Sequence, residues 1–143
     1  MSKNNKLIGQ FGEKIAACFI TNSGNTIIYK NYKCKYGEID IISTSKIDLV
    51  FTEVKTRQNI NYGFPFESVT ESKLKKIKKA SQYFLLNENL FQNYKLNLRL
   101  DIISIIISSE LAIAILAENN QNFIDVSRLV SGADYELEQI TDI

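Results

Sequence analysis

Histidine is absent from this chain of 143 residues, and several familiar kinds of active site are therefore excluded. There can be no Ser-His or Cys-His nucleophile pair, no histidine-ligated zinc and no histidine general base. Cysteine is also scarce, since Cys18 and Cys34 are the only two and show neither CxxC spacing nor a surrounding ligand pattern. Such a pair is typical of reduced, structural thiols in a cytosolic protein.

Long apolar runs are missing as well. Lys3 and Lys6 are not followed by the uninterrupted apolar segment of a signal peptide. The most apolar stretch, residues 102–117, is interrupted by Ser104, Ser108, Ser109 and Glu110. It is too short and too polar to span a membrane, and two β-strands joined through residues 108–110 fit it better. We expect a soluble, cytoplasmic protein without a membrane partner.

The composition that remains is that of one globular domain, with 45% hydrophobic and 23% charged residues. The net charge of +1 hides an asymmetry, because residues 1–124 hold 16 of the 17 basic residues but 11 of the 16 acidic ones. We therefore divide the chain into a mildly basic domain, residues 1–124, and an acidic C-terminal tail, residues 125–143. The tail is expected to be a short helix or loosely held. The basic body permits a nucleic-acid partner without requiring one.

Hydrophobic periodicity predicts the order α-β-β-β-α-β-β. The expected elements are a helix at 9–20, strands at 26–33, 38–43 and 48–57, a helix from about Thr70, and strands at 98–107 and 111–118. This order predicts a single α/β domain with a central mixed β-sheet flanked by helices.

Glu13 stands out in the first predicted helix because its neighbours on that face are small or apolar: Gly9, Ala16, Ala17 and Ile20. A solvated helix face normally carries several charges. We therefore predict that Glu13 points into the protein or into a cleft.

Acidic residues and a lysine gather on two neighbouring predicted strands. Alternation places Glu38 and Asp40 on one face of their strand, and Glu53 and Lys55 on one face of the next. If the hairpin turn is even, Asp40 lies opposite Glu53 or one diagonal away, whereas an odd loop or a bulge breaks this relationship. Carboxylates that close repel unless a cation lies between them, and oxygen ligands without histidine favour Mg²⁺ or Mn²⁺. Lys55 beside such a metal could orient the water that attacks a phosphodiester.

A plainer interpretation of these residues stays open at this point. An E-x-K sequence on a strand is weak evidence by itself, and Asp40, Glu53 and Lys55 would equally suit an ion-pair ladder on a half-exposed sheet.

The motifs, read in order, resemble the YraN-like family of bacterial proteins. They are GQFGE at 9–13, GEIDII at 37–42, VFTEVKTR at 50–57, Lys73, and RLD at 99–101. The resemblance covers about residues 7–118. That family is similar to archaeal Holliday-junction resolvases and to the PD-(D/E)XK nuclease fold. The resemblance thus implies a restriction-endonuclease-like domain that cuts DNA, including branched or structured DNA, with Mg²⁺ or Mn²⁺.

The resemblance also implies roles for single residues. Asp40 matches the metal-binding aspartate, Glu53 the second metal ligand and Lys55 the catalytic lysine. Glu13 matches the first-helix glutamate that completes many such sites. Ile39 stands where the name of the fold expects proline.

Candidate contacts to nucleic acid follow from position along the chain. Arg57 and Lys73 are the nearest basic residues to the predicted site, and Lys76 lies on the same lysine-rich helix, a pattern that is also typical of a solvated face. The loop between the predicted strand at 48–57 and that helix contains three aromatic residues, which could stack on bases or cap the core: Tyr62, Phe64 and Phe66. Asp101, beside Arg99 on a later predicted strand, is expected to pair structurally with a basic group, and a supporting role near the metal is the alternative.

Three functions are open from the sequence. The first is a Mg²⁺-dependent endonuclease, for which a homodimer would permit paired cuts, although the sequence shows no interface for one. The second is a non-catalytic nucleic-acid-binding or adaptor module on the same fold. The third is a protein-interaction or structural role in which the acidic tail docks a partner.

Overall fold

The computed structural model describes residues 2–58, 69–88, 95–117 and 124–141. Its elements are α1 (Lys3–Asn22), β1 (Thr26–Cys34), β2 (Gly37–Thr44), β3 (Asp48–Arg57), α2 (Glu71–Asn87), β4 (Asn97–Ile107), α3 (Ser109–Ala117), the 3-10 helix η4 (Val126–Arg128) and β5 (Tyr135–Ile140). The three aromatic residues predicted to stack or to cap the core, Tyr62, Phe64 and Phe66, lie outside the described residues.

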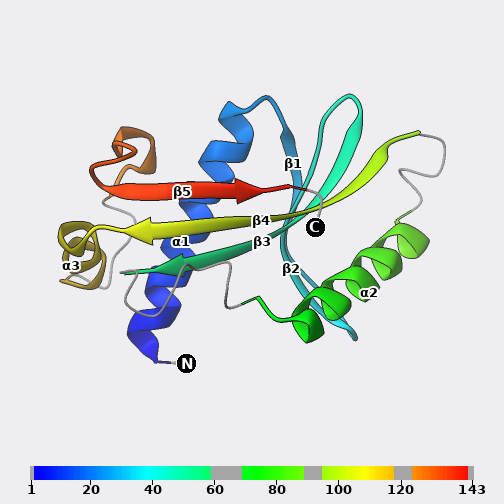
Figure 1. Ribbon diagram of the computed structural model, residues 1–143, viewed down its shortest axis with the longest axis horizontal. Helices are drawn as coiled ribbons and strands as arrows, with labels where there is room; N and C mark the ends of the chain where they lie inside the picture. The colour runs from blue at the N-terminus through cyan, green and yellow to red at the C-terminus, as the bar shows by residue number, and fades with distance from the viewer. Residues whose placement is uncertain (1, 59–68, 89–94, 118–123, 142–143) are drawn as a thin grey trace.

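The five strands form one mixed sheet in the order β1-β2-β3-β4-β5 (Figure 1). The pairs β1–β2 and β2–β3 are antiparallel, β3–β4 is parallel, and β4–β5 is antiparallel. The parallel pair requires a crossover, which contains α2. The predicted single α/β domain with a central mixed sheet flanked by helices is confirmed.

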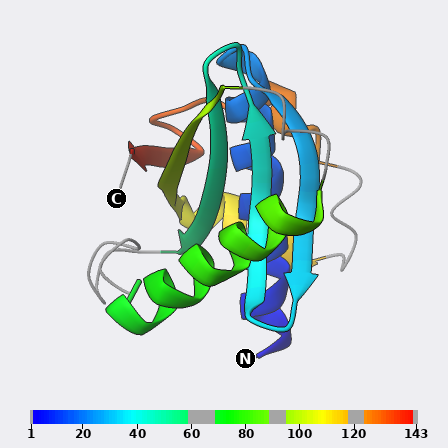
Figure 2. The same ribbon diagram turned by 90° about the vertical axis from the view of Figure 1, so that its right-hand side faces the viewer.

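Helices cover both faces of the sheet, so that two hydrophobic clusters form (Figure 2). On one face, Phe11 and Ile15 of α1 belong to a cluster with Ile103 of β4 and with residues of α3. On the other, Phe84 of α2 makes edge-on ring contacts with Tyr29, Tyr32 and Phe51 at centroid distances of 5.2–5.8 Å. These contacts fix both helices relative to the strands that carry the site described below.

The approach of α1 to β3 depends on Gly12. A Cβ atom at this position would lie 1.8 Å from Thr56 Oγ1, far inside van der Waals contact. Only glycine lets the helix come this close, and the same helix turn carries Glu13. The predicted start of the second helix is confirmed, because the Thr70 side chain accepts a hydrogen bond from the backbone of Lys73.

The strand predicted at 111–118 is wrong, because residues 109–117 form the helix α3. Ser108 caps it, since its Oγ accepts the N–H of Leu111 and its carbonyl accepts the N–H of Ala112. The sequence in this segment is apolar at nearly every position. Neither strand nor helix periodicity is therefore visible, and the alanines tolerate a helix well.

The acidic tail was expected to be a short helix or loosely held. This expectation is wrong apart from η4, a three-residue 3-10 helix at the start of the tail. The tail supplies β5, which pairs with β4 from Ile107↔Tyr135 to Ile102↔Ile140. Glu136 and Glu138 are exposed, whereas Tyr135 and Leu137 pack against the α1 cluster. The alternation of period two is a strand pattern. The observed order is therefore α-β-β-β-α-β-α-β with a 3-10 turn before the last strand.

No helix among the described residues is long and apolar enough to cross a membrane.

Candidate active site

The site lies where two neighbouring strands of the sheet separate. The pairing of β2 with β3 runs from Thr44↔Leu49 to Ile41↔Thr52 and then stops. Beyond this point β2 continues to pair with β1, and β3 continues to pair with β4. The even hairpin turn on which the sequence argument depended is present. Asp40 and Glu53 are the next pair in this register, at the mouth of the gap.

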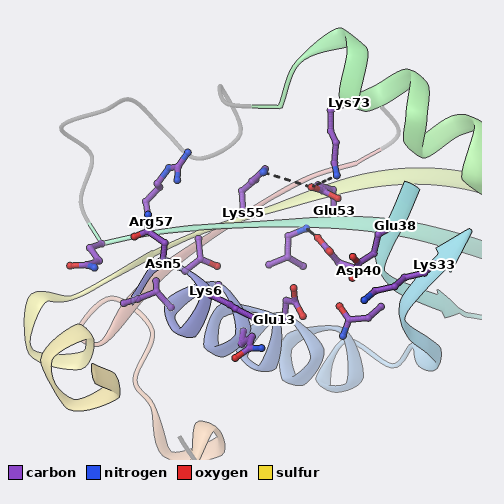
Figure 3. Close-up of a pocket in the computed structure, with 17 residues that line it drawn as sticks. Asn5, Lys6, Glu13, Lys33, Glu38, Asp40, Glu53, Lys55, Arg57 and Lys73 are labelled. Atoms are coloured by element: carbon purple, nitrogen blue, oxygen red, sulfur yellow. Dashed lines mark hydrogen bonds and ion pairs between the residues drawn. The ribbon is translucent and has the colours of Figure 1, made fainter. Parts of the chain in front are cut away.

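A hydrogen bond spans the start of the gap. The backbone N–H of Val54 donates to Asp40 Oδ2 at 2.8 Å, so a side chain of β2 takes the place of a ladder acceptor. The bond fixes one carboxylate oxygen of Asp40 beside the strand that carries Glu53 (Figure 3).

The gap opens into a cleft of about 1070 Å³. Its described lining holds five basic side chains, which are Lys6, Lys33, Lys55, Arg57 and Lys73. It also holds four acidic ones, which are Glu13, Glu38, Asp40 and Glu53. In Figure 3 the carboxylates lie between Arg57 at one end and Lys33 at the other.

Two ammonium groups reach the Glu53 carboxylate. Lys55 Nζ lies 3.9 Å and Lys73 Nζ 3.7 Å from Glu53 Oε1. The Glu53 side chain is only 4% exposed, whereas those of Lys55 and Lys73 are 33% and 38% exposed. The other oxygen of Glu53, Oε2, is buried and has no hydrogen-bond partner within the described part of the chain.

Glu13 faces the strands from the α1 side of the cleft, which confirms that it points into a cleft. With its amide nitrogen turned toward the carboxylates, Asn31 donates to Glu13 Oε2 at 3.2 Å and to Glu38 Oε1 at 2.9 Å. Asn31 has a φ of 53°, in the left-handed region that asparagine tolerates better than most residues. This backbone conformation carries the amide between two carboxylates of different elements.

Three carboxyl groups of the cleft, those of Glu13, Asp40 and Glu53, are harder to ionise than free ones. Burial, followed by the charges of Asp40 and Glu38, raises the pKa of Glu13 from 4.5 to about 7. Burial and then the charge of Asp40 raise the pKa of Glu53 to about 7, although Lys73 and Lys55 oppose the shift. Burial also raises the pKa of Asp40, against the hydrogen bond from Val54. A cation placed among these groups would offset the repulsion between their negative charges.

The donor set fits a hard divalent cation. Within the described residues, no three Asp, Glu, Cys or His side chains form a ready-made metal cage. Mg²⁺ does not require one, because it is usually held by one or two carboxylates together with waters and substrate phosphates. Asp40 and the unpartnered Oε2 of Glu53 supply two such oxygens at one place.

Most of the residues predicted from the sequence meet in this cleft. Glu13, Asp40, Glu53 and Lys55 line it together with Arg57 and Lys73. Lys76 is exposed on α2 and is not among the described lining residues. The roles of these residues stay predictions.

Several lining residues were not predicted from the sequence, among them Lys6, Lys33 and Asn31. Nothing in the sequence distinguishes Lys6 from other basic residues near the start of the chain, or Lys33 from Lys30 in the same predicted strand. Asn31 offered a signal, since asparagine is depleted in strand interiors and often marks an irregularity there.

Asp101 lies apart from the cleft lining described above, and its predicted pairing with a basic group is confirmed, because that group is Arg99. Arg99 donates to both of its oxygens at 2.9–3.2 Å, and Gln139 of β5 donates to Oδ2 at 2.9 Å. Arg99 also reaches Asp48 at 3.0 Å. The network joins β3, β4 and β5, and it is structural.

The chain is similar to known proteins over most of its length. Residues 12–105 match the uncharacterised protein family UPF0102. A UPF0102 protein of Clostridium novyi is 43% identical over 104 residues, covering 73% of this chain and 84% of the relative. One of Caldanaerobacter subterraneus subsp. tengcongensis is 44% identical over 107 residues, covering 75% and 85%. The matched region contains Glu13, Asp40, Glu53 and Lys55 and ends before β5.

Proposed function

The chain belongs to the uncharacterised protein family UPF0102, in agreement with its resemblance to YraN-like proteins, and we propose that it is a metal-dependent endonuclease that hydrolyses phosphodiester bonds in DNA. One observation carries the proposal. Asp40 and Glu53 lie side by side where β2 and β3 separate, in an open cleft lined by basic side chains. The Lys55 ammonium forms an ion pair with the Glu53 carboxylate.

Each acidic or basic residue of the site would have a separate role in hydrolysis. Asp40 and Glu53 would hold Mg²⁺ or Mn²⁺, which supplies Lewis acidity toward the phosphate and a lower pKa for a bound water. In hydrolysis a water oxygen forms a bond to phosphorus while the bond to one ester oxygen breaks, and that oxygen leaves with a proton. Lys55 orients the water and offsets the negative charge that develops on the phosphate. Glu13 lies in the same cleft, and its carboxylate could accept a proton released during the reaction.

The basic side chains around the carboxylates suit the phosphates on either side of the cut bond. Arg57 and Lys73 were predicted in this role, and Lys6 and Lys33 extend it to α1 and β1. Phosphate contacts of this kind give affinity that falls with salt and carries no sequence information. We therefore propose recognition through the backbone and the shape of the nucleic acid. Branched DNA, a homodimer and a cytoplasmic location remain proposals from the sequence.

A second function is favoured by a different observation. The described residues contain no ready-made cage of three acidic ligands, which suits a nucleic-acid-binding or adaptor module without catalysis. A binding module does not require an acidic side chain at position 53. Glu53 is nearly completely buried beside Asp40, and this raises its pKa, so the arrangement is costly without a metal to bind. We therefore rank it below the endonuclease.

The proposal is tested with purified protein and a panel of labelled substrates: four-way, flap, single-stranded and duplex DNA, and RNA. Each is incubated with Mg²⁺, with Mn²⁺ or with a chelator, and Glu53→Gln serves as the matched variant. We expect cleavage of at least one DNA substrate that requires the metal and disappears in the variant. Salt-dependent binding without cleavage of any substrate would instead establish the binding module. Preferential cleavage of RNA would overturn the assignment of DNA.

A further inference from the structure

Lys73 forms an ion pair with Glu53, the candidate metal ligand, but does not belong to the E-x-K motif of β3. It is the third residue of α2, and its side chain reaches down to Glu53 from the opposite side of the gap to α1 (Figure 3). Its ammonium lies closer to Glu53 Oε1 than that of Lys55, at 3.7 Å against 3.9 Å.

The two lysines are held in different ways. Lys55 projects from β3 two residues after Glu53, so alternation keeps both side chains on one face of that strand. Lys73 belongs to a helix whose first turn is capped by Thr70, and its side chain is 38% exposed. A long lysine side chain at that exposure can swing between the carboxylate and solvent without moving its helix.

We propose that Lys73 is an intramolecular counter-cation that competes with the divalent metal for Glu53 and, when displaced, becomes available to a phosphate of the substrate. This inference rests on the proposed function, since it assumes that Glu53 is a metal ligand. It makes Lys73 a positioning residue that couples metal binding to phosphate binding through one carboxylate.

The sign of the effect distinguishes this role from a purely structural one. If Lys73 competes with the metal, its removal should tighten metal binding, because the Glu53 carboxylate is released from one ammonium. A lysine that merely stabilises the site would, on removal, weaken metal binding or leave it unchanged. Since the pair is partly exposed and screened by solvent, we expect an effect of about tenfold.

The experiment is calorimetric titration of the full chain with Mn²⁺, using wild type, Lys73→Met, Lys73→Arg, Lys75→Met and Glu53→Gln. Methionine retains helix propensity and length, and the Thr70 cap uses only the backbone of residue 73. Lys75 is exposed on the same helix and is not among the described cleft residues, so its variant controls for net charge.

We expect Lys73→Met to bind Mn²⁺ about tenfold more tightly than wild type. Lys73→Arg and Lys75→Met should stay close to wild type, and Glu53→Gln should lose binding. Unchanged or weaker binding by Lys73→Met, or equal tightening by Lys75→Met, would overturn the inference and leave the proposed function standing. An absence of Mn²⁺ binding in wild type and Lys73→Met alike would overturn both.

Discussion

The backbone N–H of Val54 donates to Asp40 Oδ2 at 2.8 Å, at the point where β2 leaves β3. This bond satisfies a donor that has lost its ladder partner, and it also holds a carboxylate at the mouth of the cleft. Asp40 therefore has two roles, since it ends the pairing of β2 with β3 and contributes a carboxylate to the candidate site. Asparagine at position 40 can keep this bond through its amide oxygen while removing the charge.

Gly12→Ala tests whether α1 must touch β3 for the domain to be stable. The new methyl group would lie 1.8 Å from Thr56 Oγ1 and 2.7 Å from its Cβ, so the helix or the strand must move. We expect the free energy of unfolding in urea to fall by about 3 kcal/mol, at the upper end of the range for overpacking.

Gly9→Ala is the matched control, because it lies one turn away on the same helix and a Cβ atom there meets nothing within 4 Å. It should be neutral or stabilise the protein by up to about 1 kcal/mol through helix propensity. Equal stability of the two variants would show that the close approach of α1 is unnecessary.

The raised pKa of Glu13 predicts that stability depends on pH. The folded state keeps the proton of Glu13 up to about pH 7, whereas the unfolded chain releases it near pH 4.5. Between these values the folded state binds more protons, so its stability falls as the pH rises. In the presence of a chelator, Glu13→Gln should match wild type near pH 4. It should be about 1 to 2 kcal/mol more stable above pH 7, an effect reduced by solvent screening of the half-buried group.

Urea unfolding of both proteins across this pH range gives the difference directly. The glutamine side chain in the Glu13→Gln variant retains an oxygen that can accept the amide of Asn31, so the comparison isolates the charge. A constant difference at every pH would show that Glu13 titrates alike in the folded and unfolded states.

Asp101→Asn tests the structural network of Arg99. Asp101 is fully buried and accepts from Arg99 and Gln139, and its neutralisation leaves a partly buried guanidinium without its main counter-charge. We expect a loss of about 3 kcal/mol in the free energy of unfolding. Asp48→Asn removes the more exposed partner of Arg99 and should have a smaller effect, about 1 kcal/mol. A larger effect of Asp48→Asn would reverse this assignment.

The part of the site that strand alternation controls could be predicted from the sequence. Glu53 and Lys55 share a face because they are two residues apart, and an even turn was enough to bring Asp40 opposite Glu53. Glu13 was predicted from the small residues around it. In each case the position of the side chain follows from residues close in the sequence, either through strand alternation or through the small neighbours on a helix face.

The rest depended on tertiary structure. Lys33 reaches the cleft because β2 stays paired with β1 where it separates from β3, and Asn31 marks an irregularity in β1 without indicating that separation. The apolar segment at 109–117 contains no periodicity from which to choose between strand and helix. By contrast, the alternation of Tyr135, Glu136, Leu137 and Glu138 is a readable strand pattern that the acidic composition concealed.

Asp40 and Lys55 are proposed to act in metal-dependent hydrolysis, and the rate at which variants cut the DNA substrate that wild type cuts best in Mg²⁺ tests this role most directly. Asp40→Asn and Lys55→Met, checked for stability by urea unfolding, should each lose about 100-fold or more, whereas Lys75→Met should cut like wild type. Cleavage that survives in either of the first two variants, or an absence of metal-dependent cleavage by wild type, would contradict the account.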